Sequence, residues 1–284
     1  MNTHPIINFK ANALDDTSLL EKAPSIFAKG PMPGVSKRYT FVPTARIVSG
    51  LKDAGWAPVH VQEQRSRKES RLGFQKHLIR FRRVEQMEYL DEWNVELVVV
   101  NSHDAGCTYQ LHTGVFRRIC SNGLVMSERS FPAIRLRHAG LDSDLVVQSS
   151  LSLLQAMPKV GELVASFKAK VLREREAINF AAHALKLRYG SLAEAPIEAK
   201  TLLNRRRAED AGLDLWSTTN TVQENLIRGG GSDCRYDKRG RLRVVRAIRG
   251  IDSKVALNKG LWDLAEKVNH GETLPPIESH AFSE

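Results

Sequence analysis

Hydrophobic positions in the middle of the chain alternate with polar ones, whereas positions before and after this region recur with a helical period. Alternation marks apolar runs at 59–61, 78–82, 96–100, 108–120 and 133–138. These runs are rich in β-branched and aromatic residues and are separated by turn residues, which is typical of strands. No helical pattern lies between them, so an antiparallel sheet is favoured over a parallel one.

Helical spacing appears once before the sheet and returns after it. Ile47, Val48 and Leu51 share one face of a predicted helix that begins at Thr44 as its N-cap and stops at Gly55. From about Ser143 the period of 3.6 predicts further helices near 145–157, 160–171, 174–189, 197–203, 216–227 and 251–268. The predicted fold class is therefore α+β: an early helix, a mainly antiparallel sheet and a helical C-terminal half.

Proline and glycine divide the chain before and after these elements. Pro24 and the stretch Gly30-Pro31-Met32-Pro33-Gly34 interrupt the first 35 residues, which show little periodicity. We expect an extended N-terminal arm there. The predicted organisation is an arm at 1–35, a helix-plus-sheet domain at 36–142, a helical region with a basic hairpin or loop packed on the sheet at 143–270, and a tail at 271–284.

Composition narrows the class of protein. The 284 residues include 42 Lys and Arg against 32 Asp and Glu, a formal net charge of +10, with 42% hydrophobic residues. This composition is globular, and no apolar run approaches the roughly 20 residues that cross a bilayer. Three cysteines are too few for a disulfide framework, and residues 1–10 lack the order of a secretory signal. We expect a soluble, cytoplasmic protein without a membrane partner.

The positive charge is concentrated in two segments. Eight basic residues against two acidic ones lie between 62 and 83, and seven against one between 235 and 249. Arginines alternate with apolar residues in two of the strands, so a sheet with one face on the core would present arginines on the other. Arginine binds phosphate with bidentate, charge-assisted bonds, although charge runs are often only solvated. The predicted nucleic-acid contacts are Arg71, Lys76, Arg80, Arg82, Arg135, Arg137, Arg239, Arg241, Arg243 and Arg246, with Phe74 and Tyr109 as base-stacking residues.

Catalytic and metal chemistry receive little support from the sequence. Asn101-Ser102-His103-Asp104 follows a strand, but adjacent residues cannot form a nucleophile–base relay, which needs groups from different segments. His103, Asp104 and His112 are therefore only weak catalytic candidates. Cys107, His112, Cys120 and His138 match no short zinc-ligand spacing. We predict no metal and no cofactor.

The helix predicted at 216–227 has polar residues where core residues are expected. Asn220, Gln223 and Glu224 share a face with Trp216 and Ile227. A buried amide without a partner costs about 1–3 kcal/mol. Two interpretations stay open: a hydrogen-bonded network in the core, or a polar groove that holds a ligand.

Several segments together resemble a known family. Residues 38–44 (RYTFVPT), 73–81 (GFQKHLIRF), 101–104 (NSHD) and 114–124 (GVFRRICSNGL) are similar to successive signatures of domain of unknown function 932, the phage/plasmid-like protein group of bacteria. Residues 222–230 and 257–262 resemble its later blocks, so the resemblance covers about 36–265. It implies a protein of mobile genetic elements and brings no established activity or catalytic residue. A basic sheet-plus-helix domain is also distantly similar to single-strand annealing proteins of the Rad fifty-two kind, which is an analogy of fold alone.

The leading functional hypothesis is a non-enzymatic nucleic-acid-binding protein of a phage or plasmid that binds single-stranded DNA in recombination or replication. A second hypothesis is a host-interaction or anti-defence protein whose basic face binds an acidic host protein. A third is a metal-dependent hydrolase or nuclease. The sequence does not decide between a monomer and a homo-oligomer.

Overall fold

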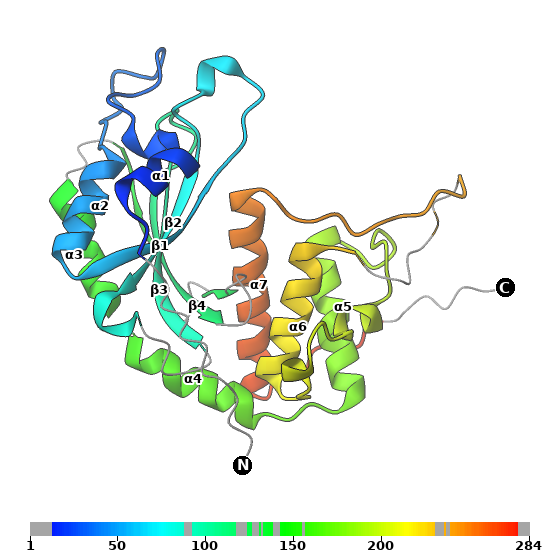
Figure 1. Ribbon diagram of the computed structural model, residues 1–284. Helices are drawn as coiled ribbons and strands as arrows, with labels where there is room; N and C mark the ends of the chain where they lie inside the picture. Colours follow the sequence, from blue (N-terminus) through cyan, green and yellow to red (C-terminus); the bar gives the residue numbers. More distant parts are fainter. Residues whose placement is uncertain are drawn as a thin grey trace. The chain divides into compact units, whose positions relative to one another are not determined.

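The computed structural model describes residues 13–87, 93–117, 124–126, 131, 133–138, 143–154, 157–230, 236 and 239–277 (Figure 1). It divides into two compact units. Unit 1 comprises Met1–Gly123 and Phe131–Met157, and unit 2 comprises Leu124–Ser130 and Pro158–Glu284. Cys120, the expected strand end at 118–120, the first 12 residues of the expected arm and the last seven residues of the tail lie outside the described residues.

An antiparallel sheet forms the centre of unit 1. Its strands β1, β2, β3 and β4 pair in chain order, and β6 pairs with β4. The α+β prediction is confirmed, with the sheet in the middle of the chain and helices after it. The strands of this sheet are β1 (Trp56–Glu63), β2 (His77–Arg83), β3 (Trp93–Asn101), β4 (Tyr109–Arg117) and β6 (Ile134–Leu136).

One face of this sheet packs against helices to make the core of unit 1. The face carries every second residue of each strand, among them Ile79, Leu97 and Leu111, all buried. Helix α2 (Thr44–Asp53) covers this core with the apolar stripe that the sequence predicted. Helix α3 (Ser143–Leu154) packs beside α2, so it belongs to unit 1, whereas the predicted boundary at 142/143 had grouped it with the later helices.

The prediction of an extended N-terminal arm is wrong for residues 16–27, which are largely helical. Helix α1 (Asp16–Lys22) begins where the Asp15 carboxylate accepts a hydrogen bond from the Ser18 N–H at 2.7 Å. A 3-10 helix (Pro24–Phe27) follows, and proline is tolerated at the first position of such a turn. Leu19, Ala23 and Ile26 are fully buried in the core of unit 1. Their spacing of four and three residues is the signal that the prediction missed.

Unit 2 is mainly helical. Helix α6 (Leu215–Arg228) has most of its residues buried and contacts α5 (Glu174–Tyr189) and α7 (Ile251–Asn269). It begins at the Asp214 cap and ends at Gly229, where φ is positive at 72° and an added Cβ would lie 2.3 Å from the Val245 carbonyl oxygen, so a side chain has no room. The elements of unit 2 are β5 (Leu124–Val125), α4 (Met157–Ala169), α5 (Glu174–Tyr189), 3-10 helices at Ala199–Leu203 and Ala208–Asp210, α6 (Leu215–Arg228) and α7 (Ile251–Asn269).

The basic segment after α6 has little regular structure in its described part. Tyr236 and Leu242 form an isolated antiparallel bridge, and the Ile248 N–H donates to the Ile227 carbonyl at 2.8 Å. The segment thus packs along the C-terminal end of α6. Within the residues that the structure describes, no helix has the length and apolar content to cross a membrane.

Replacing the buried Leu19 by Ala tests whether α1 is part of the fold. Leu19 is 0% exposed and its neighbour Leu20 is 49% exposed, so the two truncations remove the same atoms from different environments. We expect Leu19→Ala to lower the free energy of unfolding by about 2–5 kcal/mol, and Leu20→Ala to change it by less than about 0.5 kcal/mol. Urea denaturation measures both. Equal effects would contradict the packing of α1.

Candidate nucleic-acid interface

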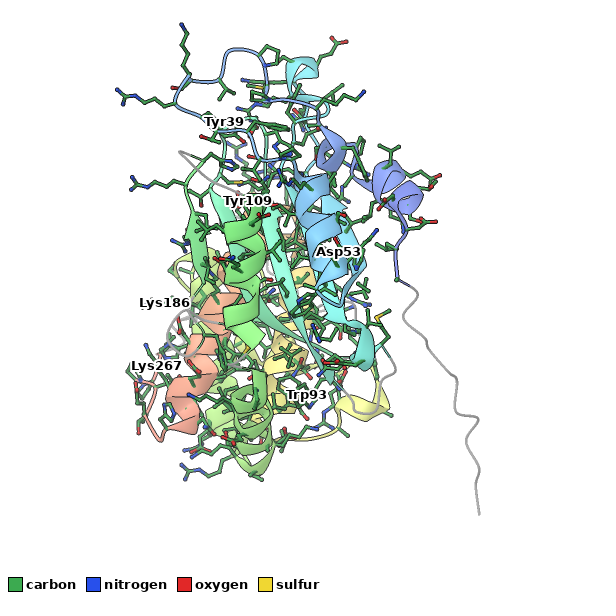
Figure 2. All side chains as sticks on the ribbon, turned by 90° about the vertical axis from the view of Figure 1, so that its left-hand side faces the viewer. Tyr39, Asp53, Trp93, Tyr109, Lys186 and Lys267 are labelled. Atoms are coloured by element: carbon green, nitrogen blue, oxygen red, sulfur yellow. The ribbon has the colours of Figure 1, made fainter. Side chains whose placement is uncertain are left out.

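Four segments meet at one end of the unit 1 sheet, here called the loop end: residues 37–40, 64–76, 102–108 and 135–138. His77 pairs with Glu63 on one side and Asn101 on the other, so the β1–β2 and β3–β4 connections leave the sheet together. Leu136 pairs with Tyr109, which brings the end of β6 to the same place. Figure 2 shows Tyr39 at this end of the unit and Trp93 at the opposite end.

A buried polar network, the Thr44 network, lies directly under the loop end. The Thr44 hydroxyl is 3.0 Å from His77 Nε2 and 3.1 Å from His103 Nε2, and it accepts a hydrogen bond from Asn101 Nδ2 at 3.0 Å. Asn101 Oδ1 in turn lies 2.9 Å from His138 Nε2. Thr44 is the first residue of α2 and makes no side-chain cap, so the expected N-cap role is replaced by this network.

Hydrogen-bond accounting assigns the tautomers of two of these histidines. His77 Nδ1 lies 2.8 Å from the Ser25 hydroxyl, which can donate or accept, and 3.2 Å from the Gln75 carbonyl, which can only accept, so a proton on Nδ1 satisfies both contacts. His77 Nε2 then accepts the Thr44 hydroxyl proton, and His103 must donate from Nε2 to the Thr44 oxygen. This leaves a lone pair on His103 Nδ1, for which the described residues provide no hydrogen-bond partner.

The network also fixes the loops through backbone hydrogen bonds. The His103 N–H donates to the Phe74 carbonyl at 3.0 Å, and the His103 carbonyl accepts from the Met32 N–H at 2.9 Å. Tyr39 stacks on His138 with ring centroids 4.5 Å apart. Three loops are thus held in place by a set of neutral, buried side chains.

The three weak catalytic candidates do not converge. His103 is fully buried in the Thr44 network. His112 projects from the face of the sheet opposite to that of Leu111, and its Nε2 lies 3.1 Å from Gln110 Oε1. Asp104 accepts a hydrogen bond from the Gly106 N–H at 2.8 Å, which is a turn contact. Among the described residues, no group of three or more His, Cys, Asp or Glu is placed to hold a metal ion.

The prediction that β2 presents its arginines on an exposed face of the sheet is wrong. Arg80 and Arg82 are 8% and 1% exposed, and both bind the carboxylate of Glu96 on β3, at 2.6 Å and 2.5 Å. The Arg80 guanidinium also lies 3.5 Å from the centre of the Phe116 ring. The alternation of side chains is as predicted, but this face of the sheet is buried as well. The predicted phosphate contacts at Arg80 and Arg82 are therefore enclosed within an ion-pair cluster.

Other basic residues of the loop end remain on the surface. Arg135 within β6 and Arg137 directly after it are exposed, as are Arg65, Arg67 and Lys68. Arg71 is exposed too and lies 3.7 Å from Asp104, while Lys76 is partly exposed. A polar hollow of about 120 Å³ opens between these loops, lined by Gln64, Arg65, Ser66, Arg71, Gln75, Lys76, Asp104 and Gly106.

The two proposed stacking residues differ in exposure. Tyr109 is 0% exposed and belongs to the core of unit 1, so its ring is not available for stacking on a base. Phe74 is partly exposed on the β1–β2 connection. It remains available for stacking beside Arg71.

In unit 2 the polar side chains of α6 are enclosed and bonded within the protein. Asn220 Nδ2 donates to the Trp216 carbonyl at 2.7 Å, and Gln223 Nε2 donates to Asn258 Oδ1 at 3.0 Å. Glu224 forms ion pairs with Arg207 and with Arg228, the latter at 3.0 Å. Asn220, Gln223 and Glu224 are therefore each bonded to other residues of unit 2 and line none of the described pockets.

The remaining predicted contacts, Arg239, Arg241, Arg243 and Arg246, lie in the segment after α6 in unit 2. Arg239, Arg241 and Arg246 are exposed and Arg243 is partly exposed. Three of them line a hollow with the end of α5, which is described below.

Removing the Thr44 hydroxyl should destabilise unit 1. In Thr44→Val, the Asn101 amide and two imidazole nitrogens lose a buried partner, so we expect the free energy of unfolding to fall by at least about 2 kcal/mol. Thr44→Ser keeps the hydroxyl and should cost about 1 kcal/mol for the lost methyl group. Urea denaturation compares them, and an equal loss in both variants would show that the network contributes little.

The buried histidines predict a stability that falls in mild acid. Burial lowers the pKa of His77 from 6.5 to about 3 and that of His103 to about 4. Below about pH 6.5 these two histidines bind protons in the unfolded chain but stay neutral in the folded chain. The free energy of unfolding should therefore decrease from pH 6.5 towards pH 4. Urea midpoints across this range measure the slope. His103→Asn should reduce the slope and the exposed-site control His270→Asn should not; an unchanged slope in His103→Asn would contradict the assignment.

Segments that carry the family resemblance supply the residues of both buried networks. Thr44, His77, Asn101 and His103 come from three of these segments and meet in unit 1. Gln223 and Asn258 come from two later ones and meet in unit 2. The resembling segments therefore converge in space within each unit.

Comparison with known proteins agrees with this resemblance. The family model described as "Domain of unknown function (DUF932)" matches residues 31–262. The UPF0380 proteins YafZ and YfjQ of Escherichia coli (strain K12) are each 35% identical over 248 residues, which covers 87% of this chain and 89% of each relative. No solved structure matches. The chain thus belongs to the family of proteins that contain domain of unknown function DUF932.

Proposed function

We propose that the protein binds nucleic acid, preferentially single-stranded DNA, through the loop end of unit 1. The observation that supports this best is the gathering of basic side chains from three distant segments, 37–38, 65–76 and 135–137, at one end of the sheet. Among the described residues, Arg65, Arg67, Lys68 and Arg137 have no carboxylate within ion-pair distance. Cationic loops without local neutralisation attract a polyanion.

The shape of this surface favours a flexible strand over a duplex. The basic residues lie on loops and on a short strand, with the partly exposed Phe74 among them. Phosphate contacts combined with stacking on an aromatic ring are typical of single-strand binding, and one stacked base contributes about 1–3 kcal/mol. The Thr44 network supports the surface from below, because it fixes the loops that present these side chains. A role in recombination or replication of a phage or plasmid is the biological setting we infer.

A salt-dependent binding assay tests the proposal. We expect a fluorescently labelled oligo-dT to bind at about 50 mM salt, with an affinity that falls steeply as salt rises. The double variants Arg65→Gln/Arg67→Gln and Arg135→Gln/Arg137→Gln should each weaken binding about tenfold. Each lost phosphate contact should also reduce the salt slope by about 0.7. Fluorescence anisotropy titrations measure the affinity and the slope.

The matched control removes two exposed cations from unit 2, Lys159 and Arg175, by the same change to Gln. It should bind oligo-dT within about twofold of the unchanged protein. Absence of binding to any DNA or RNA at about 50 mM salt would overturn the proposal, as would equal losses in the control. Co-purification with one acidic host protein, unaffected by nuclease, would then favour the protein-binding hypothesis.

A further inference from the structure

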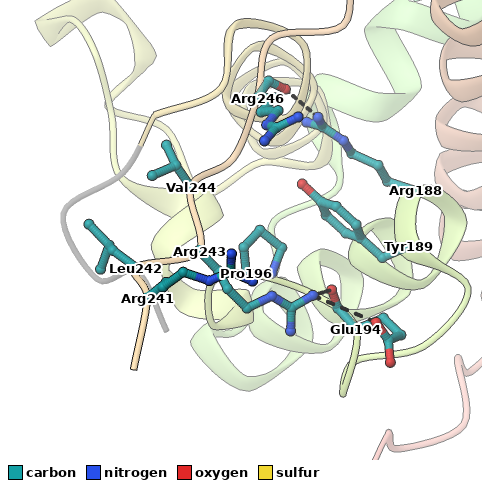
Figure 3. Close-up of a pocket in the computed structure, with 9 residues that line it drawn as sticks. All are labelled: Arg188, Tyr189, Glu194, Pro196, Arg241, Leu242, Arg243, Val244 and Arg246. Carbon is teal, nitrogen blue, oxygen red and sulfur yellow. Dashed lines mark hydrogen bonds and ion pairs between the residues drawn. The ribbon is translucent and has the colours of Figure 1, made fainter. Parts of the chain in front are cut away.

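Unit 2 contains a concave site separate from the buried network of α6. It is a hollow of about 730 Å³, here called the Arg188 hollow, formed by the end of α5, the loop after it and the segment 241–246 (Figure 3). Small-molecule sites in proteins have volumes of about 300–1,000 Å³. The residues around it are Arg188, Tyr189, Glu194, Pro196, Arg241, Leu242, Arg243, Val244 and Arg246.

The wall of the Arg188 hollow has an excess of positive charge. Four guanidinium groups line it against one carboxylate, that of Glu194, which lies 3.6 Å from Arg243. Arg188 donates to the backbone carbonyls of Leu226 and Arg246, which orient its guanidinium without neutralising it. Within the described part of the chain, neither Arg188 nor Arg246 has a carboxylate at ion-pair distance.

Holding cations together in this way is unfavourable without an anion. Partial burial lowers the pKa of Arg188, which shows that its charged form loses solvation there. The charge of Arg246 lines the same space. A phosphate bound at the exposed Arg246 would offset the repulsion between these guanidinium groups, because a guanidinium can bind phosphate oxygens with paired, charge-assisted hydrogen bonds.

The rest of the wall is apolar and partly aromatic. Leu242 and Val244 are 53% and 51% exposed, so both present apolar surface on the same wall of the hollow. The Tyr189 ring faces the hollow beside the Arg188 guanidinium, 5.0 Å from it. The Tyr189 hydroxyl has no hydrogen-bond partner among the described residues. A flat ring would cover these apolar side chains and contact the accessible part of the Tyr189 ring, whose hydroxyl oxygen is itself buried.

We propose that the Arg188 hollow binds a nucleotide, with its phosphate at Arg241, Arg243 and Arg246 and its base against Tyr189. The combination of a flat ring and an anion in one ligand matches a wall that is apolar on one part and cationic on the other. A free nucleotide and a nucleotide within a single strand share this chemistry. The inference concerns unit 2 alone and stands independently of the loop end.

Two probes separate these sources: ADP, followed by isothermal titration calorimetry, and a fluorescently labelled dT hexamer, followed by anisotropy. At least one should bind to the full chain. Arg246→Gln and Arg241→Gln, both at exposed positions, should each weaken that binding about tenfold. The control Arg175→Gln removes the same charge from α5 outside the hollow and should leave it within about twofold.

Variants of Tyr189 test the aromatic contact. Tyr189→Leu should weaken ADP about tenfold while binding of inorganic pyrophosphate stays unchanged, and Tyr189→Phe should retain most of the ADP affinity because the ring remains. Should Tyr189→Leu fail to fold, Tyr189→Phe and the arginine variants decide.

The binding results with the two probes either support the inference or overturn it. Binding of ADP that is lost in Arg246→Gln assigns a free nucleotide, and binding of the hexamer alone with the same loss assigns a strand; both support the inference. No binding of either probe at millimolar concentration overturns it, as does an equal effect of Arg175→Gln. The loop-end variant Arg135→Gln/Arg137→Gln should leave ADP binding unchanged, so failure here is distinguishable from failure of the proposed function.

Discussion

The hydroxyl of Thr44 joins helix α2 to strands β2 and β3, and through Asn101 to the segment after β6. One oxygen can take part in three hydrogen bonds, and all three are used, so the side chains around it can be arranged in few ways. In a buried site such bonds are strong when complete and costly when broken. The network requires neutral imidazoles, which ties the stability of unit 1 to pH. Through the backbone of His103 it also holds the segments of Phe74 and Met32 in place beside the β3–β4 connection.

Charge on this protein serves two different purposes. Arg80 and Arg82 form buried ion pairs with Glu96 within the sheet. Breaking this cluster would leave an uncompensated buried charge. Arg65, Arg67 and Arg137 stay in solvent at the loop end, and the arginines after α6 line a concave site. The 42 Lys and Arg residues of the sequence thus include members of internal ion pairs and members of surfaces of distinct shape. We propose a chain of phosphates as the ligand of the loop end, and a single nucleotide as the ligand of the Arg188 hollow, which has a volume of about 730 Å³.

Most secondary structure could be predicted from periodicity because the elements are long or strongly alternating. The strands and the helices after residue 143 were predicted at nearly their observed positions. Helix α1 was missed because seven residues give too short a pattern, and such a helix owes its stability to packing in the core more than to its own propensity. The polar face of α6 was recognised as unusual, but the partner of Gln223 is 35 residues away, and only the contact of α6 with α7 identifies Asn258.

The candidate site was predicted least well where pairing across strands decides the outcome. The sequence by itself determined the type and order of the elements, the alternation of arginine with apolar residues and the family to which the chain belongs, since these depend on local spacing and composition. The tertiary structure decided which arginines face solvent and which residues meet around Thr44. Alternation defines two faces of a strand without stating which is covered, and the register that places Glu96 beside Arg80 and Arg82 arises only when β2 and β3 pair.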